Sequence, residues 1–244
     1  MRNYFDQHDK IVLQFSGGKD SLATLYLCRK WWDKMTVVWL NTGAAFPETI
    51  AQMEGIKKLV PNFVEINSNQ PEWIASNGIP SDVVPILNTI LGKRFTPNNR
   101  IMIQDWIACC GHNLWLPMQE YIAQSGYTLV IRGQRADEEK TNPIRSGHIE
   151  NGVEYLFPLE DWTSEQVFEY LRSENIEIPA HYSYMNTSLD CMDCTAHLSE
   201  NVGKFKYMAE FHHELHDRVV SNLIKLNSAI DAEKHVLETL CHKT

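Results

Sequence analysis

The sequence predicts an α/β protein built on a doubly wound, mostly parallel five-stranded sheet. Short apolar runs alternate along the chain with segments of helical character, which is the pattern of strand–helix–strand units. Glycine-rich or arginine-rich segments follow several of these runs directly, as expected where parallel strands end at one edge of a sheet. The expected strands are residues 11–15, 36–41, 63–67, 129–131 and 155–159.

Local start and stop signals predict the helices. Pro47, followed by an acidic residue, suits the first turn of a helix. Thr163, with Gln166 three residues later, has the pattern of a capping box. Residues 105–125 form one helical pattern that Pro117 is expected to kink or break, because proline has no amide hydrogen to donate.

Length and charge limit the classes of protein that the chain fits. The 244 residues accommodate one large domain and an appendage, so we assign residues 1–198 to the α/β domain and 199–244 to a helical C-terminal segment. A net charge of −9 argues against general nucleic-acid binding, which relies on neutralising phosphates. No apolar signal core and no run of membrane-spanning length is visible, so we expect a cytoplasmic protein without membrane attachment.

The segment after the first expected strand has the features of an anion site. It consists of Ser16, Gly17, Gly18, Lys19, Asp20 and Ser21 and opens a helical pattern. Glycines let backbone amides approach an oxyanion closely, and the amides at a helix start favour negative charge. The lysine adds a point charge and the serines add hydroxyl donors. The segment is not a Walker A loop, because the glycine spacing differs and an aspartate follows the lysine.

Two further segments leave expected strands at what should be the same edge of the sheet. Thr42 and Gly43 follow the second strand, and taken alone they also fit a plain turn. The second segment, after the fourth strand, contributes Arg132, Gly133, Arg135 and Arg145. Its arginines suit phosphate or sulfate because guanidinium binds these groups through two parallel hydrogen bonds. Alternatively, Asp137 and Glu138 pair with these arginines on the surface.

Six cysteines in a chain that is expected to be cytoplasmic indicate metal or redox chemistry more than structural disulfides. Cys109 and Cys110 are adjacent, whereas Cys191 and Cys194 have Cys-x-x-Cys spacing. Separately, the first pair fits a protein core and the second fits a redox dithiol. Together they supply the four thiolates of a [4Fe–4S] cluster or a structural zinc. We favour the cluster, because adjacent cysteines strain two bonds to one small ion.

These motifs resemble a known family. The glycine loop resembles the pyrophosphate loop of the adenine nucleotide alpha hydrolase superfamily. The strings Phe-Pro-Glu-Thr after Thr42-Gly43 and Pro-Leu-x-Asp-Trp-Thr before the helix at Thr163 resemble the phosphoadenylyl sulfate (PAPS) reductases. A Cys-Cys pair followed by Cys-x-x-Cys-Thr is similar to the iron–sulfur adenylyl sulfate (APS) reductases. The resemblance implies a [4Fe–4S] cluster on the four paired cysteines and a nucleotide at the loop.

The sequence departs from the family pattern at three places. Asn41 stands where an aspartate is usual, and Asn113-Leu114 stands where Arg-Lys commonly follows the cysteine pair. The family's nucleophilic cysteine lies near the C-terminus in a Glu-Cys-Gly-x-His string. Cys241 has this position but not this surrounding string, so it is a candidate nucleophile and equally a free thiol at the terminus.

Two activities follow from the resemblance. The first is thiol-dependent reduction of APS or PAPS to sulfite, with Cys241 as nucleophile and thioredoxin or glutaredoxin as reductant. The second is an ATP-dependent enzyme that adenylylates a substrate and inserts sulfur with the help of the cluster. A non-catalytic nucleotide or cluster sensor is a third class. The sequence leaves the oligomeric state open, including a homo-oligomer.

Overall fold

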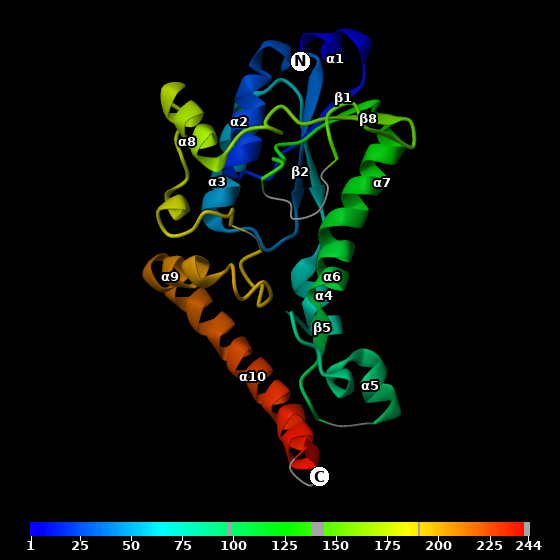
Figure 1. Ribbon diagram of the computed structural model, residues 1–244, viewed down its shortest axis with the longest axis vertical. Helices are drawn as coiled ribbons and strands as arrows, with labels where there is room; N and C mark the ends of the chain where they lie inside the picture. Colours follow the sequence, from blue (N-terminus) through cyan, green and yellow to red (C-terminus); the bar gives the residue numbers. More distant parts are fainter. Residues whose placement is uncertain (97–98, 138–143, 190, 242–244) are drawn as a thin grey trace. The chain divides into compact units, whose positions relative to one another are not determined.

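The structure, a computed structural model, describes residues 1–96, 99–137, 144–189 and 191–241. The chain divides into two compact units (Figure 1). The first, here called the sheet unit, contains Met1–Asn41, Ala45–Asn67 and Pro117–Leu189. The second, here called the cysteine unit, contains Thr42–Ala44, Ser68–Leu116 and Asp190–Thr244.

The sheet unit carries the main sheet, which has six strands within the described residues and the order β3-β2-β1-β6-β8-β7. All neighbouring pairs are parallel except β7 with β8. The α/β, doubly wound, mostly parallel class predicted from the sequence is therefore confirmed. The strands are β1 (Ile11–Gln14), β2 (Met35–Asn41), β3 (Phe63–Asn67), β6 (Leu129–Ile131), β7 (Ile149–Glu150) and β8 (Val153–Leu156).

The prediction of five strands was wrong by one. The additional strand, β7, has two residues and pairs with β8 across the tight turn at Asn151-Gly152. Both turn residues have positive φ, 51° and 80°, as a two-residue hairpin turn of the Asn-Gly type requires. The last strand also begins earlier than expected, at Val153, because the turn fixes where pairing starts.

Strand order reverses at β1, which lies between β2 and β6. From β1 the chain moves first to β2 and β3 on one side and later to β6 and β8 on the other. In open parallel sheets this arrangement leaves a crevice at the carboxyl ends of the two central strands, where ligands commonly bind. The segments that leave β1 and β6 are therefore the ones to inspect for a site.

Helices cover both faces of the sheet (Figure 1). On one face, side chains of α2, α3 and α8 pack with Ile11 and Leu13 in the larger apolar core. On the other face, Ile122 of α7 packs with Val12 and Val130. The helical segments of this unit are α1 (Arg2–Gln7), α2 (Lys19–Leu27), η1 (Arg29–Trp31), α3 (Pro47–Leu59), α7 (Leu116–Ser125), α8 (Ser164–Ser173) and η4 (Ala180–Ser183).

Two predicted helix starts are confirmed. Pro47 is the first residue of α3, where its missing amide hydrogen leaves no bond unmade. Thr163 caps α8: its Oγ1 accepts from the amide of Gln166, and the Gln166 side chain accepts from the amide of Thr163. The capping box thus satisfies two amides that the first turn cannot pair internally.

The cysteine unit contains a small parallel pair of strands that was not predicted from the sequence. Ile79 pairs with Ile103 in register, and Gly78 with φ +104° precedes the first strand. A Cβ on Gly78 would lie 2.3 Å from the carbonyl carbon of Met102, so only glycine fits there. The elements are α4 (Gln70–Asn77), β4 (Ile79–Ser81), η2 (Ile86–Asn88), α5 (Ile90–Phe95), β5 (Ile103–Asp105), α6 (Trp106–Cys110), α9 (Val202–Phe211) and α10 (His213–Cys241).

The helix expected over residues 105–125 is interrupted as the proline implies. A π-helical turn, Gly111–Trp115, separates α6 from α7, whose second residue is Pro117. Because Pro117 has no amide hydrogen, the carbonyl of Asn113 loses its usual helical donor. The Ser68 hydroxyl donates to that carbonyl at 2.8 Å instead. The π turn and this hydrogen bond together accommodate the proline in the helical segment.

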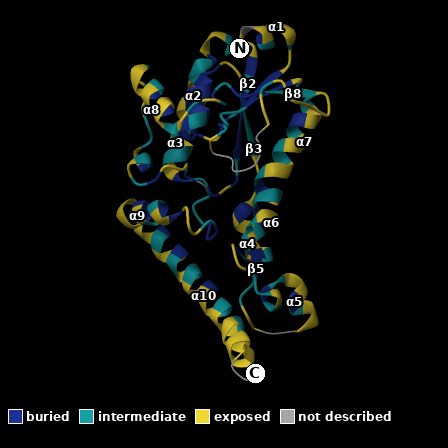
Figure 2. Cartoon of the chain, in the orientation of Figure 1, coloured by how far each residue is buried: buried dark blue, intermediate teal, exposed yellow. Residues whose placement is uncertain are grey.

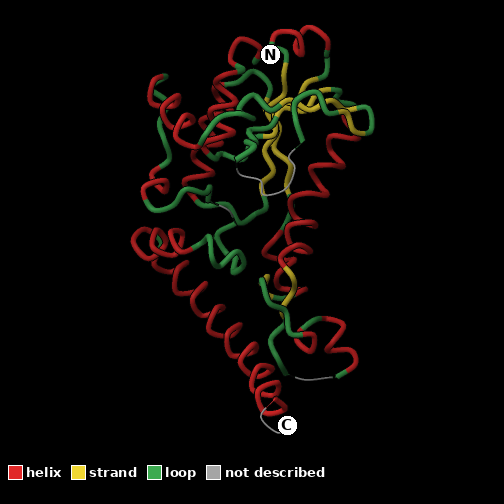
Figure 3. Tube along the Cα trace, in the orientation of Figure 1, coloured by secondary structure: helices red, strands yellow, loops and turns green. Residues whose placement is uncertain are grey.

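The C-terminal helical prediction is confirmed in outline, with a break at His212, where φ is −139°. Figure 3 shows α10 as one long helix. Figure 2 shows that its first half carries the buried positions, which include Leu215, Val219 and Leu226. No helix in the described ranges is both long and apolar enough to span a membrane.

Replacing Gly133 with alanine should destabilise the sheet unit. A Cβ at Gly133 would lie 2.6 Å from the carbonyl carbon of Asp20, in the first turn of α2. Backbone cannot yield as a flexible side chain does, so we expect a loss of about 1–3 kcal/mol in the free energy of unfolding. Urea unfolding followed by circular dichroism measures this. Gly55→Ala is the matched control, because Gly55 lies inside α3 and a Cβ added there would meet nothing within 4 Å; equal effects would contradict the prediction.

The protein should lose stability on mild acidification through His181. Burial lowers the pKa of His181 from 6.5 to about 4, and Glu48 opposes that shift. Between these two values the unfolded chain binds a proton that the folded chain does not, so the unfolding free energy falls as the pH falls. Urea unfolding at several pH values should show this slope in the wild type and a smaller one in His181→Asn. The same slope in both proteins would exclude His181 as its source.

Candidate nucleotide-binding loop and cysteine site

The loop that leaves β1 depends on a left-handed glycine. Gly17 has φ +85°, a conformation that residues with a Cβ rarely adopt. Space is also missing, since a Cβ on Gly17 would lie 2.7 Å from Oε1 of Gln52 and 2.9 Å from Cε of Met53. The loop therefore turns sharply from β1 into α2, and Gly18 is the N-cap of that helix.

Hydroxyl groups of the loop are fixed by one another. The amide of Gly18 donates to Oγ of Ser16 at 3.3 Å, and that hydroxyl donates to Oγ of Ser21 at 3.2 Å. The Ser21 hydroxyl in turn donates to the carbonyl of Gly18 at 2.9 Å. The amide of Lys19, the first residue of α2, donates to the hydroxyl of Tyr182 at 2.7 Å. The loop is thus pre-formed, with amide donors at the start of a helix.

A buried ion network runs through the same turn. Nζ of Lys19 and Nε of Arg135 each lie 2.7 Å from the carboxylate of Asp20. Arg135 also pairs with Asp137 at 2.5 Å. The Lys19 and Arg135 side chains are both only 4% exposed, so the acids compensate charges that water cannot reach. Of the two acids considered from the sequence, Asp137 does pair with an arginine, while Glu138 lies outside the described residues.

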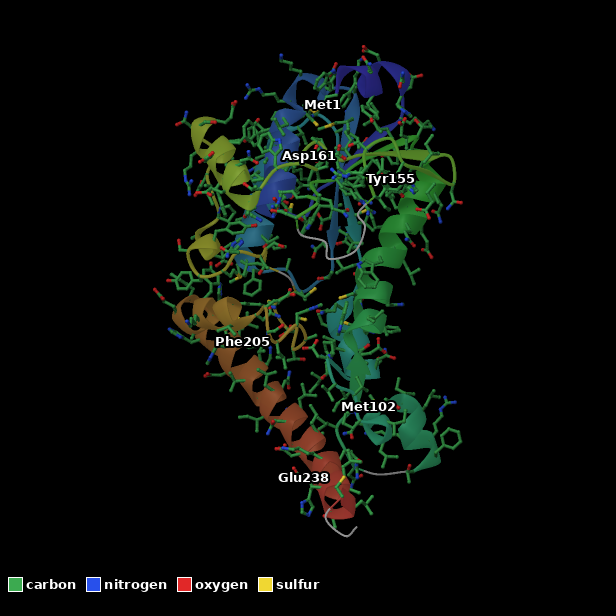
Figure 4. All side chains as sticks on the ribbon, in the orientation of Figure 1. Met1, Met102, Tyr155, Asp161, Phe205 and Glu238 are labelled. Atoms are coloured by element: carbon green, nitrogen blue, oxygen red, sulfur yellow. The ribbon has the colours of Figure 1, made fainter. Side chains whose placement is uncertain are left out.

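Arg132 and Arg145 have different surroundings from Arg135. Nε of Arg132 donates to Oε1 of Gln14, and its guanidinium carbon lies 5.4 Å from the centre of the Tyr155 ring, which is labelled in Figure 4. Arg132 therefore links the carboxyl ends of the adjacent strands β1 and β6. Arg145 pairs with Asp161 at 2.6 Å on the surface, and this hydrogen bond raises the pKa of Arg145. Gly133 lies against the backbone of α2, as described above.

Thr42 and Gly43 belong to the cysteine unit, although the sequence suggested that they accompany the nucleotide loop. The Thr42 side chain is buried; its Oγ1 accepts from the amide of Ala44 at 3.3 Å and lies 3.2 Å from Sγ of Cys191. Its carbonyl accepts from the amide of Gln70 at 2.8 Å. Gly43 has φ +75° and lets the chain turn there. Thr42 thus stands beside a cysteine.

Cys109 is surrounded by amide donors in a dry environment. It is 3% exposed, and burial raises the pKa of its thiol to about 11, with Cys194 adding to the shift. Nε2 of Gln70 lies 3.9 Å from its sulfur, and Nδ2 of Asn113 lies 4.0 Å from it. These two hydrogen bonds lower the pKa of the thiol and so oppose the rise caused by burial. Both amides are themselves buried. N–H donors around a cysteine sulfur are what a metal-bound thiolate needs.

The Cys191–Cys194 segment is anchored from several sides. The amide of Cys194 donates to the carbonyl of Cys191 at 3.1 Å, closing a tight turn. Nζ of Lys204, which is 1% exposed, donates to the same carbonyl at 2.8 Å. Arg218 pairs with Asp193 at 2.7 Å. The Cys-x-x-Cys turn is therefore held by two cations, one of them buried.

All six cysteines have free thiols. Within the described part of the chain, no group of three or more His, Cys, Asp or Glu side chains is placed to hold a single metal ion. Tetrahedral zinc would require sulfur atoms about 3.8 Å apart. Cys109 and Cys194 are close enough to affect each other electrostatically.

Cys241 is the last residue of α10, and its side chain is exposed. It lies about 35 Å along the helix from Arg218, at about 1.5 Å per residue. Since Arg218 pairs with Asp193, the helix separates this thiol widely from the Cys191–Cys194 turn. The cysteine unit thus contains five of the six cysteines, and Cys241 lies at the end of α10 that is remote from the Cys191–Cys194 turn.

Several residues around these sites were missed from the sequence. Gln70 and Lys204 gave no signal, because a lone glutamine or a lysine in a helical pattern has no distinctive spacing. Asn113 was noted only as a departure from the family. Tyr182 gave no signal either, because a single tyrosine outside any motif has no distinctive pattern. Their contacts join residues far apart in the chain, up to 163 positions for Lys19 and Tyr182.

Comparison with solved structures supports the fold. The crystal structure of phosphoadenylyl-sulfate (PAPS) reductase from Candida auris, a phosphate complex, superposes with a TM-score of 0.52 at 16% identity. The match covers 74% of this chain and 80% of that one. At this identity the likeness concerns the fold alone.

Sequence comparison finds relatives of modest identity. An uncharacterized protein of Methanocaldococcus jannaschii is 26% identical over 220 residues, covering 87% of this chain but 47% of the relative, so the chain spans about half of that protein. Adenosine 5′-phosphosulfate reductase 2 of Bacillus subtilis is 26% identical over 190 residues, covering 77% of this chain and 73% of the relative.

A protein family accounts for most of the sequence. The phosphoadenosine phosphosulfate reductase domain family matches residues 10–197, which include the glycine loop, the arginine segment and both cysteine pairs. The boundary at residue 198 assigned from the sequence stays a prediction. With the fold and the loop geometry described above, this match shows that the chain belongs to the phosphoadenosine phosphosulfate reductase domain family.

Proposed function

We propose that the chain is an oxidoreductase that binds an adenylyl sulfate, APS or PAPS, and releases sulfite. The observation that carries the proposal is the glycine loop at the reversal of strand order, where amide donors lie at the start of α2 in a member of this family. The relatives named adenosine 5′-phosphosulfate reductases support the substrate class.

The loop supplies the groups that would hold the phosphosulfate. The proposed donors are the amides near Gly17 and Gly18, the hydroxyls of Ser16 and Ser21, and the ammonium of Lys19. Asp20 orients that ammonium and Arg135 by accepting from both. We assign binding roles also to Arg132, Gly133 and Arg145, and to Thr42 and Gly43 in the cysteine unit.

The cysteine unit has the donor set of an iron–sulfur cluster. We propose that Cys109, Cys110, Cys191 and Cys194 hold a [4Fe–4S] cluster, which would supply iron-bound sulfur and a fixed charge when bound. A cluster presents a separate iron to each thiolate, so its ligands need not converge on one point as they would for zinc. The amides of Gln70 and Asn113 beside Cys109, and the Thr42 hydroxyl beside Cys191, suit thiolates that carry iron.

The proposed reaction has three steps, which use one thiol of the protein and two thiols of the reductant. The Cys241 thiolate attacks the sulfur of the phosphosulfate, a sulfur–sulfur bond forms, and the nucleotide leaves with the electron pair of the broken sulfur–oxygen bond. A thioredoxin or glutaredoxin thiolate then attacks the Cys241 sulfur and expels sulfite. The second thiol of the reductant resolves the mixed disulfide and restores the Cys241 thiol.

A second candidate rests on the position of Cys241. An exposed thiol at the end of a long helix, together with the absence of the usual Arg-Lys at Asn113-Leu114, fits a plain reductase poorly. The alternative is an enzyme that adenylylates an acceptor with ATP, releasing pyrophosphate, and then inserts sulfide-level sulfur with the help of the cluster as AMP leaves. A relative named sulfate adenylyltransferase subunit 2, from Streptomyces lavendulae, is 24% identical over 211 residues and supports this superfamily chemistry.

Anaerobically purified protein should contain iron and acid-labile sulfide in equal molar amounts. Replacing a proposed ligand, Cys109→Ala or Cys194→Ala, should remove most of the iron, because a cluster with three thiolates is held less firmly. Elemental analysis and visible absorbance measure the loss. Cys28→Ala is the matched control, since Cys28 is buried in the core of the sheet unit. Zinc in place of iron, or iron loss in the control alone, would refute the cluster assignment.

The reductase activity should depend on Cys241. With the cluster intact, the wild type should release sulfite from APS in the presence of thioredoxin. Cys241→Ser should reduce the rate by about 10³-fold or more, because a hydroxyl is a far weaker nucleophile than a thiolate. Full activity of the variant would remove Cys241 from the mechanism. If the wild type releases no sulfite but frees pyrophosphate from ATP when an acceptor is added, the second candidate replaces the first.

A further inference from the structure

The anion site of the sheet unit already has an occupant from the same chain. The amide of Lys19 is at the first position of α2, where helix geometry provides no internal acceptor. This amide donates to the hydroxyl of Tyr182 at 2.7 Å, which is a short and well-made hydrogen bond. A phenol oxygen thus stands where an oxyanion held by this amide would place one of its own oxygens.

The tyrosine is held there by its neighbours. It lies in η4 (Ala180–Ser183), and its ring meets that of Phe168 edge-on at 5.4 Å between centroids. Nζ of Lys19 lies 5.7 Å from the centre of the Tyr182 ring. These contacts fix the ring, so the hydroxyl reaches the loop without support from the amide.

The segment that carries Tyr182 touches the loop at a second point. A Cβ placed on Gly18 would lie 3.1 Å from Cβ of Ser188 and 3.3 Å from the Tyr182 hydroxyl. Two side chains of the stretch 182–188 therefore approach the glycine turn. An anion seated on the turn would need the room that the hydroxyl takes.

We propose that Tyr182 is a ligand-displaced occupant of the anion site: its hydroxyl accepts from the Lys19 amide in the free protein and gives up that amide to an oxygen of a bound phosphate or phosphosulfate. This inference rests on the proposed function of the loop. A charged oxygen accepts a hydrogen bond more strongly than a phenol does, by roughly twofold in strength, so the exchange favours the anion. The hydroxyl competes with ligand and weakens its binding.

Isothermal titration of the whole protein with APS, and separately with inorganic pyrophosphate, tests the proposal. Tyr182→Phe keeps the ring, and with it the contact to Phe168, but removes the competing oxygen. We expect the variant to bind both probes about 2- to 10-fold more tightly, the effect of freeing one neutral hydrogen bond. Tyr184→Phe, on the same segment, is the matched control and should bind as the wild type does.

A measurement on the free protein distinguishes failure of the Tyr182 proposal from failure of the proposed anion site. In the free protein, Tyr182→Phe should shift the Lys19 amide resonance and speed its hydrogen exchange, whereas Tyr184→Phe should not. Unchanged binding by Tyr182→Phe would overturn the inference, and weaker binding would overturn it and make Tyr182 a residue that holds the ligand. If neither probe binds wild type or variant while the Lys19 resonance responds as expected, the proposed anion site fails and this inference fails with it.

Discussion

The sharp turn between β1 and α2 is the constraint on which the sheet unit depends. Gly17 adopts a left-handed conformation, and Gln52 and Met53 leave no room for a side chain at its Cα. At the first turn of α2, Gly133 lets the segment after β6 approach the helix backbone. Two glycines from neighbouring strands thus bring the ends of β1 and β6 together, and the amides at the start of α2 lie at the point where strand order reverses.

The cationic side chains at this turn are balanced by a neighbouring carboxylate, independently of the net charge of the chain. The ammonium of Lys19 and the guanidinium of Arg135 share the carboxylate of Asp20, and all three lie largely out of water. Burying a cation without a partner costs several kcal/mol, so the pair of cations needs its acid even in the absence of a ligand. A chain with a net charge of −9 can therefore keep two cations beside the proposed anion site.

The sequence predicted elements well where the signal is local. The boundaries of β3 and β6 were predicted correctly because each is a compact apolar run, and Pro47 and Thr163 mark helix starts through their own chemistry. The pair of strands β4 and β5 was missed because each has three residues and they pair across 24 positions. Tyr182 was missed as a partner of the loop for the same reason, since no pattern within its own segment points to Lys19.

The surroundings of Cys109 show why family resemblance alone could not describe this site. Where the resemblance leads one to expect Arg-Lys after the cysteine pair, this chain has Asn113-Leu114. The π turn that accommodates Pro117 places the Asn113 amide 2.9 Å from the carbonyl of Cys109 and beside its sulfur, while Gln70 approaches the sulfur from α4. Neutral N–H dipoles from two segments of the chain therefore lie beside this thiol. They stabilise a thiolate over a short range and, unlike a lysine, carry no charge that acts at a distance.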